Sequence, residues 1–126
     1  MMTVEEAAQQ PVSILVACLF EEDTIRACLE RITRAMPQAE VLVIHGGTDR
    51  TCEIAAEMAR ENPHIVAVKN ENDQGKGHAI QVGIARARHD VMCQFDADLQ
   101  FAPEDLPALF MPIFNGEADV VIGSRF

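Results

Sequence analysis

The sequence predicts a single α/β domain, in which a mostly parallel sheet carries helices on both of its faces. Short apolar runs alternate along the chain with segments in which apolar residues recur every three or four positions. The runs are apolar at successive positions, which is typical of strands buried on both faces of a parallel sheet. A chain of 126 residues is long enough for one domain with a substantial core, but not for two.

The polar and acidic start of the chain, residues 1–11, is expected to be a flexible N-terminus. The apolar run 13–18 predicts the first strand. A helix is expected at 24–36, because its apolar residues share one face and Pro37 lies just beyond its end. The apolar run 41–44 predicts the second strand.

The turn Gly46-Gly47 separates the second strand from the next helix. Thr48 or Asp49 can cap this helix, which is expected to run to about residue 61 with its small and apolar residues on one face. The apolar run 65–68 predicts the third strand.

The last part of the chain predicts two more helices and two more strands. A helix is expected at about 77–87, and the fourth strand at 91–95. Pro103 suits the first position of a helix at 104–110, because proline lacks the N–H that would be unpaired there. The segment 119–122, which is apolar after Asp119, predicts a fifth strand.

Polar side chains follow every predicted strand. Ligands of parallel sheets bind at the carboxyl ends of the strands, so these segments are expected to meet at one edge. They are Glu21-Glu22, the residues from His45 to Asp49, the loop 70–76, the segment from Asp96 to Gln100, and Arg125.

Asp96 and Asp98 are the strongest candidates for a site. Two carboxylates this close repel each other unless a positive group lies between them. Residues two apart in an extended chain can point the same way, and Gln100 adds an amide oxygen. These hard oxygen donors suit Mg²⁺ or Mn²⁺. The alternative interpretation is an acidic loop whose aspartates cap the following turn.

Two basic positions suit phosphate. The glycines of Gly75-Lys76-Gly77 let the backbone approach a ligand, and Lys76 supplies a charge at the start of a helix. The alternative is an ordinary turn, and the segment is not a Walker A loop. Arg125 suits diphosphate recognition, or is a surface residue near a chain end.

Composition excludes some functions. A formal charge of −10, six Phe and no Tyr or Trp argue against binding nucleic acid. The four cysteines lack C-x-x-C spacing, so neither a zinc site nor a redox pair is indicated. Buried, reduced thiols imply a reducing compartment and predict a cytoplasmic protein, since no signal peptide or anchor is visible in this sequence.

From 12 to 126 the chain resembles the nucleotide-binding half of family-2 glycosyltransferases, especially the polyprenol-phosphate (dolichol-phosphate) mannosyl- and glucosyltransferases. The resemblance implies the GT-A fold, a Rossmann-like mostly parallel sheet. It rests on Glu21-Glu22-Asp23-Thr24-Ile25, Gly46-Gly47-Thr48-Asp49-Arg50-Thr51, Asn72 with Gly75-Lys76-Gly77 and Ala79, Asp96-Ala97-Asp98-Leu99-Gln100 with Pro103-Glu104-Asp105, and Ile122-Gly123-Ser124-Arg125.

The resemblance also implies site roles. Asp96, Asp98 and Gln100 would bind a divalent Mn or Mg ion that carries the diphosphate of a UDP- or GDP-linked sugar. The residues that would contact the nucleotide sugar are Ala17, Leu19, Glu21, His45, Lys76, Asp96, Ala97 and Arg125. The acceptor would be a polyprenyl phosphate or a glycan, and its attack would invert the anomeric carbon.

Two segments depart from the family pattern. The family usually has Pro-x-Tyr-Asn-Glu where this chain has the residues from Ala17 to Glu21, so Leu19 replaces the tyrosine near the base. The family usually has Asp-Asp-Gly-Ser where this chain has Ile44-His45-Gly46-Gly47. Ile44 cannot accept a hydrogen bond from a base, and His45 can do so only in one tautomer.

The chain stops at Phe126, whereas the family continues into an acceptor-binding half. It is therefore expected to be truncated before that half, and no catalytic base is assigned within it. Association with a membrane surface would then depend on regions or partners outside it. The alternatives are a catalytically inactive binding or interaction module on the same fold, and a nucleotidyltransferase, which the absence of a phosphate loop after the first strand disfavours.

Overall fold

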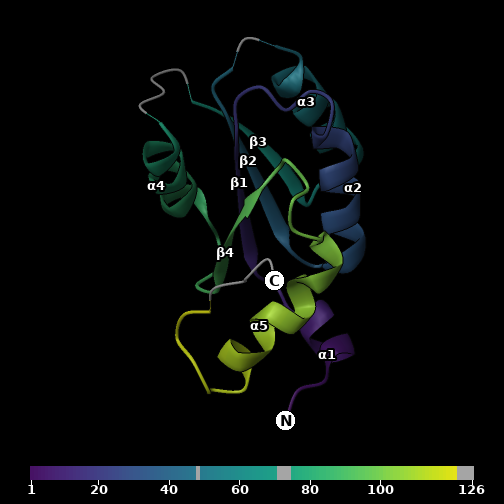
Figure 1. Cartoon of the computed structure of the whole chain (residues 1–126), viewed down its shortest axis with the longest axis vertical. Coiled ribbons are helices and arrows are strands. Elements are labelled where there is room, and N and C mark those ends of the chain that lie inside the picture. The colour runs from purple at the N-terminus through teal and green to yellow at the C-terminus, as the bar shows by residue number, and fades with distance from the viewer. Residues whose placement is uncertain (48, 71–74, 122–126) are drawn as a thin grey trace.

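The computed structural model describes residues 1–47, 49–70 and 75–121. Strands and helices alternate from β1 to β4, as the sequence predicts (Figure 1). The elements in chain order are α1 (Val4–Ala8), β1 (Ser13–Cys18), α2 (Ile25–Ala35), β2 (Glu40–His45), α3 (Thr51–Glu61), β3 (Ile65–Lys69), α4 (Lys76–Arg86), β4 (Met92–Asp96), the 3₁₀ turn η1 (Pro103–Asp105) and α5 (Leu106–Phe114).

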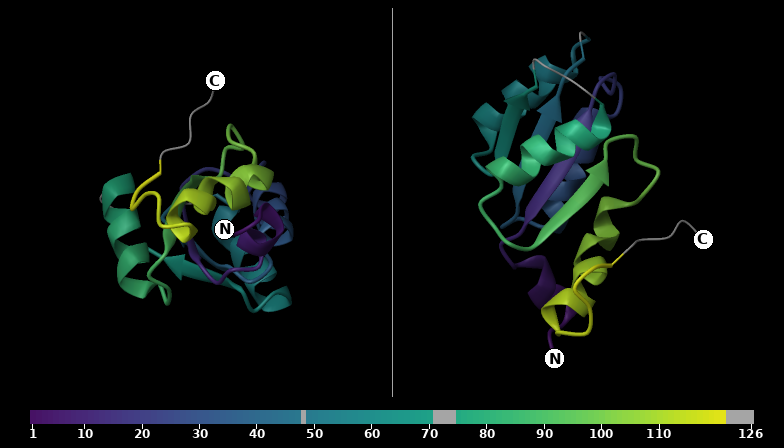
Figure 2. Two further views of the ribbon diagram at one scale, coloured as in Figure 1. Left: turned by 90° about the horizontal axis from the view of Figure 1, so that it is seen from below. Right: turned by 90° about the vertical axis from the view of Figure 1, so that its left-hand side faces the viewer.

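The strands form one parallel sheet in the order β3-β2-β1-β4. Helix α4 covers one face of the sheet, while α2 and α3 cover the other (Figures 1 and 2). The predicted mostly parallel sheet with helices on both faces is therefore confirmed. From β1 the order runs to β2 on one side and to β4 on the other. Ligands of open α/β sheets bind at such a reversal, beside the carboxyl ends of the strands.

The core has two parts because alternate residues of a strand face opposite sides of the sheet. Ile14 and Val16 of β1 contribute to the larger part, which also includes buried residues of α2, α3 and α5. Leu15 between them belongs to the smaller part beneath α4. There α4 packs closely, since a Cβ added at Gly83 would lie 2.9 Å from Ile44 Cδ1.

The N-terminal segment differs from the expected flexible stretch. Residues 4–8 form helix α1, which contacts α5 (Figure 1). Thr3 and Glu6 form a capping box at its start, and Ala7 is buried. The Met2 N–H donates to Asn115 Oδ1 at 2.9 Å. This capping box pattern was the sequence signal for the helix.

The predicted fifth strand is not formed over the part of it that the structure describes. Residues 119–121 are not in a strand, and Val120 is 76% exposed; Ile122 lies outside the described residues. After α5 the chain turns at Gly116, which has a φ of 74°. Over the described ranges β4 pairs with β1 alone, so residues 119–121 lack the ladder that makes an apolar run a strand.

Candidate functional site

A cavity of about 270 Å³ lies at the carboxyl ends of β1, β2 and β4, beside the start of α4. It is lined by seven of the predicted site residues: Ala17, Leu19, Glu21, Lys76, Asp96, Ala97 and Asp98. They come from three stretches that are distant in sequence. The sheet brings them together because Ala17 of β1 pairs in register with Asp96 of β4.

The loop after β1 is held by the start of α3. The Glu21 N–H donates to Thr51 Oγ1 at 2.9 Å, and the Glu22 N–H donates to Asp49 Oδ2 at 3.4 Å. Asp49 Oδ1 also accepts from the Thr51 N–H at 3.1 Å. Asp49 does not occupy the predicted cap position, which is taken by Arg50 without a side-chain cap hydrogen bond. Thr48, the other predicted cap, lies outside the described residues. The loop that carries Glu21 is therefore fixed to a neighbouring helix.

The two aspartates occupy the end of β4 and the turn after it. Asp96 is half-buried, and Asp98 is exposed. Leu99 has a φ of 61°, a left-handed conformation that leucine rarely adopts. This turn lets Asp98 Oδ1 accept a hydrogen bond from the Gln100 N–H at 3.1 Å.

Gln100 lies beside a neighbouring cavity of about 210 Å³ rather than the first one. Asp96 and Asp98 line both cavities, so all three predicted metal ligands border the second. The pair of aspartates thus separates two hollows at the end of β4.

Lys76 is the first residue of α4, and its Nζ lies 2.5 Å from Asp96 Oδ1. The preceding residue, Gly75, has a φ of 101°, which favours glycine over other residues. The predicted pairing of a glycine turn with a basic helix start is therefore present at the cavity. It places an ammonium group against one of the aspartates.

The cavity is strongly acidic. Burial raises the pKa of the Glu21 carboxyl, and the negative charges of Asp98, Asp49 and Asp96 raise it further. Three carboxylates and a single ammonium line the cavity within the described residues. Such a cavity attracts a cation, because each carboxylate disfavours ionisation of the others.

The described part of the chain contains no group of three or more His, Cys, Asp or Glu residues that could hold a metal ion. A metal at Asp96 and Asp98 would take one or two carboxylates from the protein and its other ligands from elsewhere. Mg²⁺ is commonly bound in this way, by one or two carboxylates together with phosphate oxygens and water. The residues present fit such a cation.

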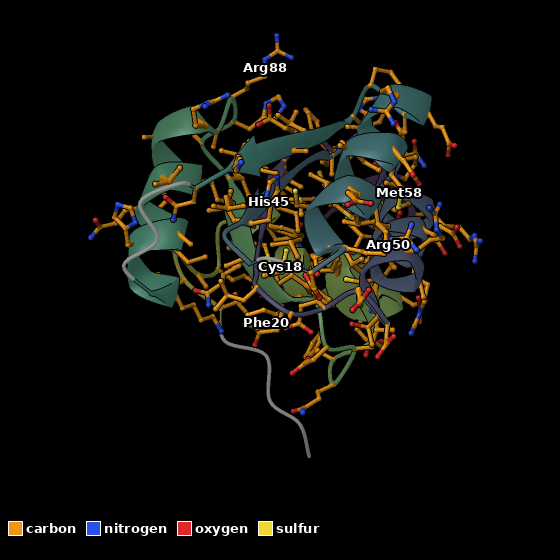
Figure 3. All side chains as sticks on the ribbon, turned by 90° about the horizontal axis from the view of Figure 1, so that it is seen from above. Cys18, Phe20, His45, Arg50, Met58 and Arg88 are labelled. Atoms are coloured by element: carbon orange, nitrogen blue, oxygen red, sulfur yellow. The ribbon has the colours of Figure 1, made fainter. Side chains whose placement is uncertain are left out.

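His45 does not line the cavity. On β2 the neighbouring Ile44 faces the cavity, so His45 points to the opposite side of the sheet. His45 is buried, and its Nδ1 has no hydrogen-bond partner among the described residues. Burial lowers the pKa of His45, and the charge of Lys69 lowers it further. Figure 3 looks down on this end of the molecule and places His45 and its register partner Cys18 near the centre.

Sequence reasoning did not select several residues that line the cavity, although most lie in segments that it examined. Ile44 pairs in register with Ala17, and this register, which the sequence does not specify, places it at the cavity. Asn70 follows the third strand, is buried, and has its Nδ2 at 3.3 Å from His78 Nδ1. The remaining ones are Cys18, Gly46 and Ala79, whereas Gly75 belongs to the predicted glycine turn. Arg125 and Asn72 lie outside the described residues.

No helix in residues 1–47, 49–70 and 75–121 is long and apolar enough to cross a lipid bilayer.

Comparison with known proteins places nearly the whole chain in one family. The family model described as glycosyl transferase family 2 matches residues 13–126. The low-salt glycan biosynthesis hexosyltransferase Agl6 of Haloferax volcanii is 36% identical over 117 residues, which cover 90% of this chain and 27% of that protein. The dolichol-phosphate mannosyltransferase of Pyrococcus furiosus is 32% identical over 118 residues, covering 91% of this chain and 33% of that protein.

One similar solved structure contains a sugar nucleotide and a metal ion. The mannosyltransferase PcManGT from Pyrobaculum calidifontis, in complex with GDP-Man and Mn²⁺, matches with a TM-score of 0.67 and 25% identity. The match covers 76% of this chain and 30% of that one. This chain thus spans about a third or less of the length of these relatives. With the family model matching residues 13–126, the chain belongs to glycosyltransferase family 2.

Proposed function

We propose that this domain binds the diphosphate of a sugar nucleotide through a divalent cation, as part of an inverting glycosyltransferase. The observation that carries the proposal is the meeting of Asp96, Asp98 and Lys76 in one cavity at the carboxyl ends of the strands. Carboxylates suit the cation and the ammonium suits phosphate, so these groups together match a metal-bound diphosphate.

Mn²⁺ or Mg²⁺ is the proposed cofactor, and Asp96 and Asp98 would hold it, with Gln100 as a further oxygen donor. When bound, the cation would stabilise the negative charge that grows on the leaving diphosphate. Lys76 would contact phosphate from the start of α4, where the helix dipole also favours negative charge. The presence of Mn²⁺ and GDP-Man in the related mannosyltransferase supports this assignment.

The nucleoside would lie over the apolar part of the cavity, where Ala17, Leu19 and Ile44 are exposed to it. The cavity volume of about 270 Å³ is at the small end for a ligand site, so it would hold only part of a sugar nucleotide. Glu21 lines the same cavity and is proposed to contact the nucleotide sugar. Arg125 remains a proposed diphosphate contact. His45 is not proposed as a base contact, because its side chain faces away from the cavity.

The acceptor is proposed to be a polyprenyl phosphate or a glycan. The related Pyrococcus protein is named as a dolichol-phosphate mannosyltransferase, and the Haloferax protein as a glycan biosynthesis hexosyltransferase. An acceptor hydroxyl or phosphate would attack the anomeric carbon opposite the diphosphate. No residue of this chain is proposed as the base for this step.

Calorimetry with Mn²⁺ and a panel of UDP- and GDP-sugars tests the proposal. At least one sugar nucleotide should bind in the presence of Mn²⁺, and Asp98→Asn should weaken this binding at least tenfold, as expected for loss of a charged metal ligand. Unchanged binding by Asp98→Asn, or no binding by the parent chain, would reject the metal role.

Binding without transfer is the second candidate function, and one observation favours it. Ile44 lines the cavity at a position where the resemblance implies an acidic residue for the base. A transfer assay with radiolabelled sugar nucleotides and a polyprenyl phosphate separates the two candidates. Any sugar transfer by this chain excludes the inactive module.

A further inference from the structure

The ion pair between Lys76 and Asp96 stands where a metal would be held. Lys76 Nζ lies 2.5 Å from Asp96 Oδ1, and the two side chains are 53% and 46% exposed. Gly75, with its φ of 101°, positions the first turn of α4 so that the lysine reaches across to the end of β4. This ion pair therefore links the glycine turn at the start of α4 directly to the two aspartates.

An ammonium and a divalent cation cannot share Asp96 without strong repulsion. Two positive charges a few ångströms apart repel each other, and the ammonium already uses one oxygen of the carboxylate. A cation that binds at Asp96 must therefore displace Lys76. The displaced ammonium then needs another negative partner at the mouth of the cavity.

The diphosphate of a sugar nucleotide supplies that partner. A lysine side chain is a flexible stem with a compact charge, so it can turn from Asp96 to a phosphate oxygen without moving the backbone. An ion pair between half-exposed side chains is weak, so it is readily exchanged. The cation would gain Asp96 in the same step in which Lys76 gains the phosphate.

We propose that Lys76 occupies Asp96 in the ligand-free protein and competes there with the divalent cation until diphosphate draws the lysine away, so that cation and nucleotide bind cooperatively. This inference rests on the proposed function and adds to it a positioning role for Lys76. Linkage makes the effect reciprocal: the cation should raise nucleotide affinity by the same factor by which the nucleotide raises cation affinity.

The test measures Mn²⁺ binding in the absence of nucleotide, by calorimetry and by the electron paramagnetic resonance signal of free Mn²⁺. Lys76→Met removes the competing ammonium and should tighten this binding about three- to fivefold, the size expected for a half-exposed ion pair. Simple loss of a structural residue would weaken binding or leave it unchanged, so the direction of the change is diagnostic.

Arg86→Met is the matched control, because it removes one positive charge from the other end of the same helix. Ten residues of helix place it about 15 Å from Lys76, beyond the screening length at physiological salt. Its Mn²⁺ affinity should remain that of the parent chain. Equal tightening by both variants would show a general charge effect and overturn the proposal.

The second measurement is the coupling itself. Adding GDP or UDP should raise Mn²⁺ affinity in the parent chain, and this gain should shrink in Lys76→Met by about the factor by which nucleotide-free Mn²⁺ binding tightens. One outcome would overturn the lysine exchange but not the proposed function. In it, Lys76→Met binds Mn²⁺ without nucleotide as the parent chain does, while the parent chain still binds nucleotide in a Mn²⁺-dependent way. Absence of Mn²⁺-dependent nucleotide binding in the parent chain would overturn the proposed function as well.

Discussion

The backbone N–H of Glu21 donates a hydrogen bond to Thr51 Oγ1 at 2.9 Å, and this bond ties the loop after β1 to the first residue of α3. Thr51 is 1% exposed, so water does not replace the hydroxyl if it is lost. The position of Glu21 at the cavity is therefore set by a residue that does not line the cavity itself.

Thr51→Val should destabilise the fold by about 1–3 kcal/mol, because it leaves the Glu21 N–H without its acceptor at almost unchanged side-chain volume. Urea unfolding followed by circular dichroism measures the change. Thr33→Val is the matched control on α2: its hydroxyl donates to the Leu29 and Glu30 carbonyls of its own helix, and the cost should stay within about 0.5 kcal/mol. Equal costs for the two variants would contradict the role of Thr51.

Gly47→Ala should displace the loop after β1. A Cβ at this position would lie 2.0 Å from the carbonyl oxygen of Leu19, which is backbone and cannot move aside like a side chain. Overpacking of this kind costs about 1–3 kcal/mol, and the shift of Leu19 should also weaken ligand binding. Thermal unfolding and calorimetry check the two effects.

Gly77→Ala provides the comparison for stability. A Cβ at Gly77 meets nothing within 4 Å, and the residue lies in the first turn of α4. Alanine there should leave the unfolding free energy unchanged or raise it by up to about 1 kcal/mol, through its better helix propensity. A loss of stability as large as that of Gly47→Ala would show that the contact with Leu19 is not the cause.

His45 should make the fold less stable in acid. Its pKa is lowered in the folded protein from the usual 6.5, first by burial and then by Lys69, so the folded state binds a proton less readily than the unfolded state. The stability due to neutral His45 is complete above pH 6.5 and is lost as the pH falls below that value towards the folded pKa. Urea unfolding at a series of pH values from 7.5 to 5.5 should show this decline.

His45→Gln should flatten the decline, because glutamine does not titrate. The exposed His64 offers a matched control, and His64→Gln should leave the slope of stability against pH as in the parent chain. If both variants keep the full decline, another group causes it.

Glu40 should be important at the opposite end of the sheet. It is buried, and its Oε1 accepts from Ser13 Oγ and from the Arg88 N–H, both at 2.9 Å. Glu40→Ala leaves two donors without an acceptor and should cost about 2–4 kcal/mol in the free energy of unfolding. Glu40→Gln keeps an oxygen at the same place and should cost clearly less; a loss equal to that of alanine would argue against these hydrogen bonds.

Much of the fold could be predicted from the sequence because buried parallel strands are apolar runs that need little context. The runs at 13–18 and 65–68 became β1 and β3 with nearly the same bounds. The segment 119–122 is likewise apolar from Val120 onward but has no ladder over its described residues, because strand formation depends on a partner as well as on composition. The capping box of Thr3 and Glu6 was a sequence signal for the helix at 4–8. The polar composition of this segment led instead to the expectation of a flexible N-terminus.

The site was predictable to the level of segments. Polar residues after parallel strands meet at one edge by topology, so Glu21, Lys76 and Asp98 came together as expected. The direction in which single side chains point was harder to predict from the sequence. His45 points away from the cavity because strand alternation gives that side to Ile44, and the register with β1 was needed to know this. Gln100 borders a second cavity because the backbone at Leu99 turns left-handed, which a leucine gives no reason to expect.

Leu99 also determines how the aspartate turn can move. Its backbone adopts the left-handed conformation while its side chain packs against the larger part of the core. Any fluctuation that swings Asp98 out of the cavity by rotating this turn must also pull the Leu99 side chain from a close-packed interior. The motion of the aspartate turn is therefore coupled to the core beneath it, so its fluctuations should be slower and smaller than those of a free surface loop.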